Sequence, residues 1–118
     1  MEIIDVAKMQ EMQYRLWEKH KHSWPPLKPN QARNSLLWMI EEMGEVISIL
    51  KKRGEEDVMT DMKLRKAMIE ELCDVMMFFT DVLIEFDISP VEFTNNYYRK
   101  HEKNMLRDFV NDDKNYLR

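Results

Sequence analysis

The sequence predicts an all-α fold made of long helices, and three observations support this prediction. The 118 residues include only two glycines and four prolines, so few turns can be built. Apolar side chains recur with the 3.6-residue period of a helix along most of the chain. The length and an apolar content of 44% are sufficient for a substantial core, so we expect one domain over residues 1–118.

The first helix is expected from about Ile3 to Lys21, where the apolar spacing is moderately amphipathic. Three prolines between Trp24 and Asn30 then forbid a helix and stiffen a loop. Trp17 and Trp24 flank this break. The two tryptophans either anchor the core and the loop or form an aromatic wall on which a flat ligand stacks.

The second helix is expected from Asn30 or Gln31 to about Arg53, and Gly54 is a suitable residue to end it. Residues 36–40 are apolar on every side of this helix. The helix is therefore expected to be central in the fold.

Gly44 lies inside this helix, at a position where glycine costs about 1 kcal/mol relative to alanine. The simplest reason for a glycine here is the close approach of another helix, or of a ligand, beside Glu45. We therefore expect a contact at this position.

The third helix is expected from about Thr60 to Phe86, antiparallel to the second helix across a polar linker at residues 55–57. Its apolar positions cover more than half of the circumference from Val75 onward, so it is also expected to be central. Cys73 is interpreted as a small buried packing residue. As the single cysteine, it rules out an internal disulfide and fits a reducing compartment.

The fourth helix has a clear start, because Ser89, Pro90 and Glu92 match the N-cap, first position and third position of a capping box. This helix is expected to run to about Phe109. The tail from Val110 to Arg118 is polar, and we expect it to fray.

Two acid pairs, Glu42 with Glu45 and Glu71 with Asp74, repeat one three-residue spacing on the second and third helices. Each pair lies within an apolar stripe, which is normally the buried side of a helix. Buried carboxylates that face one another are costly unless something neutralises them. A divalent cation resolves this conflict, and the alternative is that the acids lie on a wet rim. Asp81 continues the acid face of the third helix. It either supports the metal ligands without binding the metal itself or lies in solvent.

The ligand type indicates which metal would bind. All candidate ligands are carboxylate oxygens, which suit Mg²⁺, Mn²⁺ or Ca²⁺ and make zinc a poor fit. A di-iron centre would need Glu-x-x-His motifs on two helices, and His20, His22 and His101 provide no such spacing. Mg²⁺ held by a few carboxylates keeps positions open for water and for substrate phosphates.

Phosphate chemistry also needs cations that balance the developing charge. One face of the last helix carries Lys100, Asn104 and Arg107, which are the natural candidates. The alternative for this face is a solvated surface. Attack of a metal-activated water on phosphorus is the reaction class that these parts suggest.

Charge and hydropathy bear on the partners of the chain. A net charge of -4 argues against a general nucleic-acid binder. No stretch approaches the ~20 apolar residues of a membrane span, and the N-terminus lacks a signal-peptide pattern. We expect a cytoplasmic protein that binds neither nucleic acid nor membranes.

The segment Glu41-Glu42-Met43-Gly44-Glu45, followed after 25 residues by Glu71-Leu72-Cys73-Asp74, resembles the E-E-x-x-E … E-x-x-D signature of MazG-like proteins. These proteins are all-α nucleoside triphosphate pyrophosphohydrolases related to the dimeric dUTPases. The match extends from about Asn34 to Arg107, and the polar face of the last helix is similar to the basic segment that follows the acidic motifs in that family.

The resemblance implies a four-helix core assembled into homodimers or homotetramers, with active sites near subunit interfaces. It implies Mg²⁺-dependent cleavage between the α- and β-phosphates of a nucleoside triphosphate, which gives a nucleoside monophosphate and pyrophosphate. By the same resemblance, the metal ligands would be Glu42, Glu45, Glu71 and Asp74, with Glu41 behind them or orienting water. The triphosphate would be bound by Lys100, Asn104 and Arg107, and the base and sugar by Trp17 and Trp24.

We therefore expect a nucleotide pyrophosphohydrolase, and two alternatives stay open. A phosphoribosyl-ATP pyrophosphohydrolase-like relative would have similar acidic motifs. A non-catalytic helical interaction module would explain the eleven methionines, but not the acids on both apolar stripes.

Overall fold

The computed structural model describes residues 1–111, which form α-helices with no β-strand among them. The all-α prediction is therefore confirmed for this part of the chain. The chain divides into two compact units, Met1–Ile88 and Ser89–Arg118. Most of the tail that was expected to fray, residues 112–118, lies outside the described residues.

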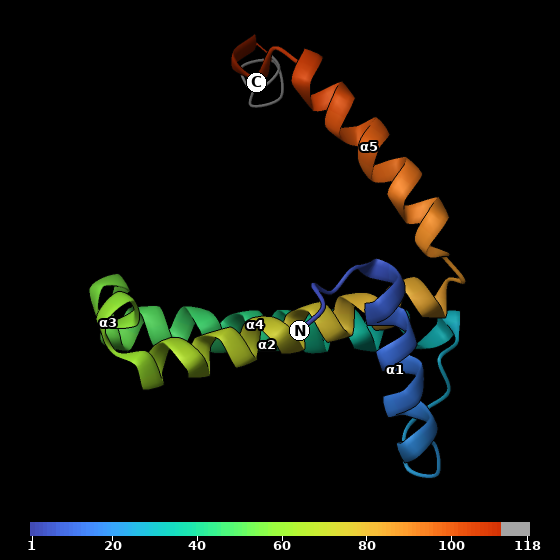
Figure 1. Ribbon diagram of the computed structural model, residues 1–118, viewed down its shortest axis with the longest axis horizontal. Coiled ribbons are helices and arrows are strands. Elements are labelled where there is room, and N and C mark those ends of the chain that lie inside the picture. The colour runs from blue at the N-terminus through green and yellow to red at the C-terminus, as the bar shows by residue number, and fades with distance from the viewer. Residues whose placement is uncertain (112–118) are drawn as a thin grey trace. The chain divides into compact units, whose positions relative to one another are not determined.

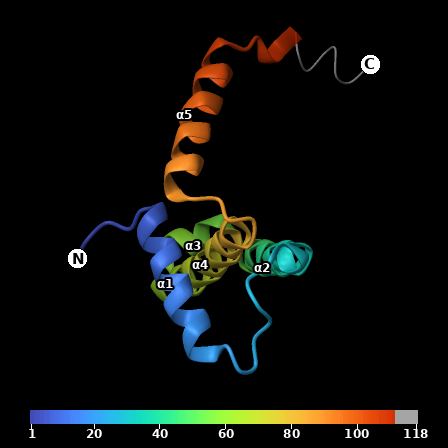
Figure 2. The ribbon, with the colours of Figure 1, turned by 90° about the vertical axis from the view of Figure 1, so that its right-hand side faces the viewer.

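Two long antiparallel helices, α2 (Ala32–Arg53) and α4 (Met62–Glu85), lie side by side and form the frame of the first unit (Figures 1 and 2). The short turn η1 (Pro29–Gln31) leads into α2, where a proline is well tolerated because the first N–H groups of a helix lack partners. The helix α2 ends at Gly54, whose φ of 83° is strained for a residue with a Cβ. These boundaries agree with the predicted second helix.

Residues 55–57, which were expected to be a linker, instead begin a short helix, α3 (Glu55–Thr60). Their acidic side chains occupy its first turn, where the partial positive charge of the helix N-terminus stabilises them. Asp61 separates α3 from α4 and caps α4 by accepting hydrogen bonds from two backbone N–H groups. Arg53 forms ion pairs with Asp57 at 3.1 Å and with Asp61 at 3.0 Å, which ties the end of α2 to both helices that follow.

The first helix, α1 (Val6–His20), packs against α4 (Figure 2). Gln10 and Gln13 are its buried residues. The Nε2 of Gln10 donates to the backbone carbonyl of Ile88 at 2.9 Å, and the Nε2 of Gln13 donates to Oδ1 of Asp81 at 2.8 Å. Because both amides are satisfied, they can be buried without a large desolvation cost.

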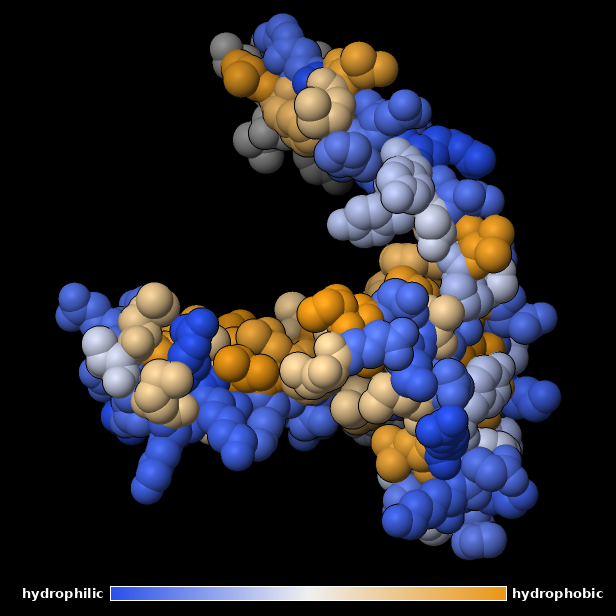
Figure 3. All heavy atoms as spheres, viewed as in Figure 1, coloured by the Kyte–Doolittle hydropathy of each residue, from blue (hydrophilic) through white to orange (hydrophobic). Residues whose placement is uncertain are grey.

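The apolar core of the first unit is small. Among residues 1–111, the buried apolar side chains are Ala32, Val58, Leu83 and Ile84. The helix α2 is central, as expected, since it packs along the length of α4. Its apolar residues are not buried on every side, however, because Leu37 and Ile40 are each 61% exposed. Figure 3 shows apolar side chains at the surface along the α2–α4 pair.

Two smaller expectations also differ from the structure. Cys73 was expected to be buried, and its side chain is exposed. A Cβ placed on Gly44 would meet no other atom within 4 Å, so no helix among residues 1–111 closely approaches it, and the approach of a ligand stays a prediction. Both residues are exposed, so helix periodicity alone overestimated how much surface this chain buries by itself.

The second unit contains α5 (Pro90–Leu106), which begins as predicted. The hydroxyl of Ser89 accepts a hydrogen bond from the backbone N–H of Glu92 at 3.1 Å. The helix ends before Arg107, whose backbone is extended, and not near Phe109 as expected. Within residues 1–111, no helix combines the length and the apolar character that crossing a lipid bilayer requires.

Candidate functional site

Three carboxylates from two helices converge at one place in the first unit. Glu42 comes from α2, and Glu71 and Asp74 come from α4, where their three-residue spacing puts them on one face. One oxygen of each residue lies within 4.8 Å of the others. The antiparallel packing of α2 and α4 therefore brings together residues that lie about 30 positions apart in the sequence, as the acid pattern predicted.

The electrostatics of this carboxylate triad show that it lacks positive charge. The pKa of Glu42 is raised from 4.5 to about 7. The largest cause is a hydrogen bond with the carboxyl group of Glu71, followed by burial and by the negative charges of Glu71, Asp74 and Glu45. Near neutral pH Glu42 is therefore partly protonated, and a bound cation could take the place of that proton.

The other two acids of the first window are placed differently. Glu45 is exposed and does not belong to the close triad, although its charge contributes to the raised pKa of Glu42. Glu41 is also exposed, and it lines the cavity beside Glu42. Metal ligation by Glu45 and orientation of water by Glu41 stay predictions.

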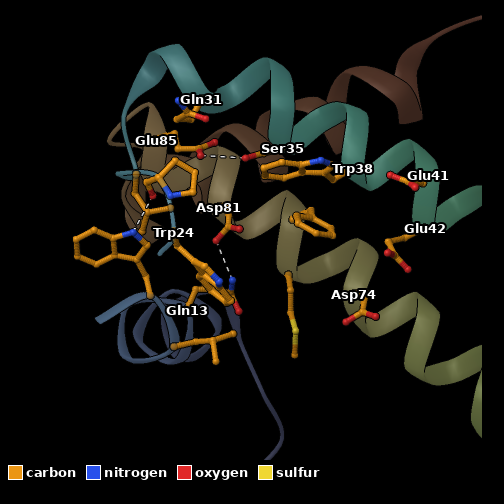
Figure 4. Close-up of a pocket in the computed structure, with 16 residues that line it drawn as sticks. Gln13, Trp24, Gln31, Ser35, Trp38, Glu41, Glu42, Asp74, Asp81 and Glu85 are labelled. Atoms are coloured by element: carbon orange, nitrogen blue, oxygen red, sulfur yellow. Dashed lines mark hydrogen bonds between the residues drawn. The ribbon is translucent and has the colours of Figure 1, made fainter. Parts of the chain in front are cut away.

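A cavity of about 450 Å³ adjoins the triad (Figure 4). Glu42 and Asp74 lie in its wall, and the aromatic side chains of Trp17, Trp24 and Trp38 form much of the rest. Acids and aromatic rings from α1, the proline loop, α2 and α4 thus meet around one space, whose volume is typical of small-molecule sites.

The loop tryptophans have structural contacts as well as a place in this wall. The Nε1 of Trp17 donates to the carbonyl of Pro25 at 2.9 Å, so it fixes the proline loop against α1. The ring of Trp24 stacks on His20 with 4.6 Å between centroids and 24° between planes. The two readings of these residues, loop anchor and aromatic wall, are therefore compatible.

Sequence reasoning missed one buried acid in this cavity. Glu85 is 4% exposed, and its Oε2 accepts a hydrogen bond from the hydroxyl of Ser35 on α2 at 2.9 Å. Burial raises the pKa of Glu85, as it does for Asp81 one turn earlier. Asp81 and Glu85 follow Asp74 at seven and eleven positions along α4, and this helical spacing is the signal that could have revealed Glu85.

The candidate phosphate-binding residues belong to the second unit. Lys100 and Asn104 lie on α5, whereas Arg107 follows the end of that helix and holds its guanidinium 4.4 Å from the ring centroid of Phe109. The common helical face expected for these three residues therefore does not extend to Arg107. Their contact with a triphosphate stays a prediction.

The donor set of the triad fits a hard divalent cation. Its ligand atoms are all carboxylate oxygens, and within residues 1–111 no histidine or cysteine joins them. Mg²⁺ and Mn²⁺ prefer such ligands and keep further positions for water or phosphate. No known protein-family model matches the chain, and no curated protein or solved structure matches it either.

Proposed function

We propose that this protein is a Mg²⁺-dependent nucleoside triphosphate pyrophosphohydrolase, which releases a nucleoside monophosphate and pyrophosphate. The observation that carries this proposal is the carboxylate triad of Glu42, Glu71 and Asp74 in the immediate neighbourhood of an aromatic cavity. The raised pKa of Glu42 reflects uncompensated negative charge in the triad, which a bound cation would neutralise. The cavity volume suits a nucleoside.

In this proposal, the triad and Glu45 hold Mg²⁺ or Mn²⁺. The bound metal supplies polarisation of phosphoryl oxygens and lowers the pKa of an attacking water. Glu41, exposed at the edge of the cavity, orients that water. The cationic Lys100 and Arg107, with Asn104 as a donor, balance the charge of the triphosphate.

We further propose that the active form is a homodimer or homotetramer. Support comes from two exposed apolar stripes at helical spacing. The stripe on α2 comprises Leu36, Ile40, Met43 and Ile47, and the stripe on α4 comprises Ile69, Leu72 and Met76. Monomeric proteins rarely leave such contiguous apolar surface uncovered.

The same stripes also favour the alternative of a non-catalytic interaction module, which would use them to bind a partner helix. A metal titration separates the two functions. The pyrophosphohydrolase predicts that millimolar Mg²⁺ raises the melting temperature of the wild type but not of Glu42→Gln, whereas an interaction module has no reason to respond to the metal.

The direct test is pyrophosphate release from a panel of ribo- and deoxyribonucleoside triphosphates and phosphoribosyl-ATP, with and without Mg²⁺. We expect Glu42→Gln and Asp74→Asn to lose on the order of 10²-fold or more in kcat/KM. Glu56→Gln is a matched control, because Glu56 is exposed on α3 and does not line the cavity. Near-full activity of either triad variant would refute the site, and no turnover of any triphosphate by the wild type would refute the function.

A further inference from the structure

Glu85 presents an unsatisfied oxygen at one end of the cavity. Glu85 is only 4% exposed, and its Oε1 has no hydrogen-bond partner among residues 1–111. Figure 4 shows Glu85 bound to Ser35 and directed to the cavity end formed by α2 and α4. A buried acceptor without a donor is costly, so this oxygen calls for a donor from outside the chain, such as a water or a ligand in the adjoining cavity.

Asp81 lies one helical turn before Glu85 in the same wall. One of its oxygens accepts from Gln13, which leaves its second oxygen for another donor. No lysine, arginine or histidine is among the residues that line this cavity in the described part of the chain. This end of the cavity therefore offers two carboxyl groups and no cation to pair with them.

We propose that the cavity end formed by Asp81 and Glu85 is a nucleobase subsite that selects bases carrying an exocyclic amino group over uracil and thymine. This inference rests on the proposed function for the identity of the ligand as a nucleotide. Cytosine, adenine and guanine each carry an exocyclic amino group whose two N–H bonds can donate to two acceptor oxygens. Uracil and thymine offer a single N–H flanked by carbonyl oxygens, and these oxygens would face the carboxyl groups.

The dimensions and walls of the cavity suit this ligand. Along α4, Asp81 lies about 10 Å and Glu85 about 16 Å from Asp74, at a rise of about 1.5 Å per residue. A nucleotide with its phosphates at the triad would therefore extend its base toward the two carboxyl groups. The rings of Trp38 and Phe78, whose centroids are 5.8 Å apart, also line the cavity and offer surfaces on which a base can stack. Stacking stabilises any base, so the selectivity among bases would come from the two carboxyl groups.

The test measures binding in the absence of metal, so that it does not depend on catalysis. The chain has three tryptophans, and Trp17, Trp24 and Trp38 all line the cavity, so intrinsic fluorescence reports its occupancy. CMP, AMP, GMP, UMP and TMP are titrated into the full-length protein in EDTA. We expect the amino-bearing monophosphates to bind about tenfold or more tightly than UMP and TMP.

Glu85→Gln should remove most of this difference while it preserves the fold, because the glutamine carbonyl can still accept from Ser35. Asp81→Asn is a second variant in case Glu85→Gln unfolds, and Glu56→Gln is the matched control. Equal binding of all five monophosphates by the wild type would overturn the inference, as would unchanged selectivity in both variants or no binding at all. Selective binding without triphosphate turnover would refute the proposed function alone, and turnover without selectivity would refute the subsite alone.

Discussion

Binding of Mg²⁺ at the carboxylate triad should expel the proton that Glu42 holds. The perturbation is the addition of metal to the metal-free protein at a series of pH values. With a pKa of about 7, Glu42 holds about half a proton at pH 7, about nine tenths at pH 6 and about one tenth at pH 8. These fractions are the numbers of protons that each bound metal ion should release.

Isothermal titration calorimetry measures this release directly, when the same titration is repeated in buffers of different ionisation enthalpy. The apparent metal affinity should fall about tenfold for each pH unit below 7, because metal and proton compete for the same oxygens. Glu42→Gln should abolish the release, and Glu56→Gln should leave it unchanged. A release near zero at pH 6, or an equal release from Glu42→Gln, would refute the assignment of the proton to the triad.

The same pKa shift predicts how the stability of the metal-free protein depends on pH. The pKa of Glu42 is about 7 in the folded chain and about 4.5 when unfolded, so the folded state holds more protons between these values. The free energy of unfolding should therefore decrease as the pH rises from about 4.5 to 7. Urea denaturation of the wild type and Glu42→Gln would detect this, since the variant should lack the decrease.

Three further substitutions test the fold by urea denaturation. Gly44→Ala should stabilise the protein by up to about 1 kcal/mol, since a Cβ there meets no atom within 4 Å, and destabilisation would mean that another chain packs on this position. Gly54→Ala should destabilise it by about 1–3 kcal/mol because of the φ of 83°, and a neutral result would contradict that backbone conformation. Ser35→Ala should cost about 1–3 kcal/mol, since it removes the donor to buried Glu85, and a negligible change would mean that water replaces the hydroxyl.

Local signals in the sequence predicted most of the secondary structure. Helix ends depend on a few adjacent residues, so the prolines before α2, Gly54 after it and Ser89 before α5 were sufficient to locate them. The helix α3 was missed because three adjacent acids look like a solvated linker, although they are favourable in the first turn of a helix. Its six residues are also too few to show a periodic pattern.

The candidate site was predictable in part. Helical spacing found Glu42, Glu71 and Asp74 because antiparallel packing of two amphipathic helices follows from their apolar faces. Glu45 lies outside the triad because of the direction in which its side chain leaves α2. The spacing of the acids in the sequence does not specify that direction. The role of Glu85 depends on a partner 50 residues away, Ser35, and no local pattern carries such a pairing.

The small core of the first unit has a consequence for how the protein should be handled. Only four apolar side chains are buried within residues 1–111, while the stripes on α2 and α4 face outward. If a second copy of the chain covers these stripes, folding and assembly are coupled. The free energy of unfolding then depends on the protein concentration. If the proposed dimer forms, each tenfold dilution should cost it about 1.4 kcal/mol, and melting temperatures measured at different protein concentrations would then not be comparable.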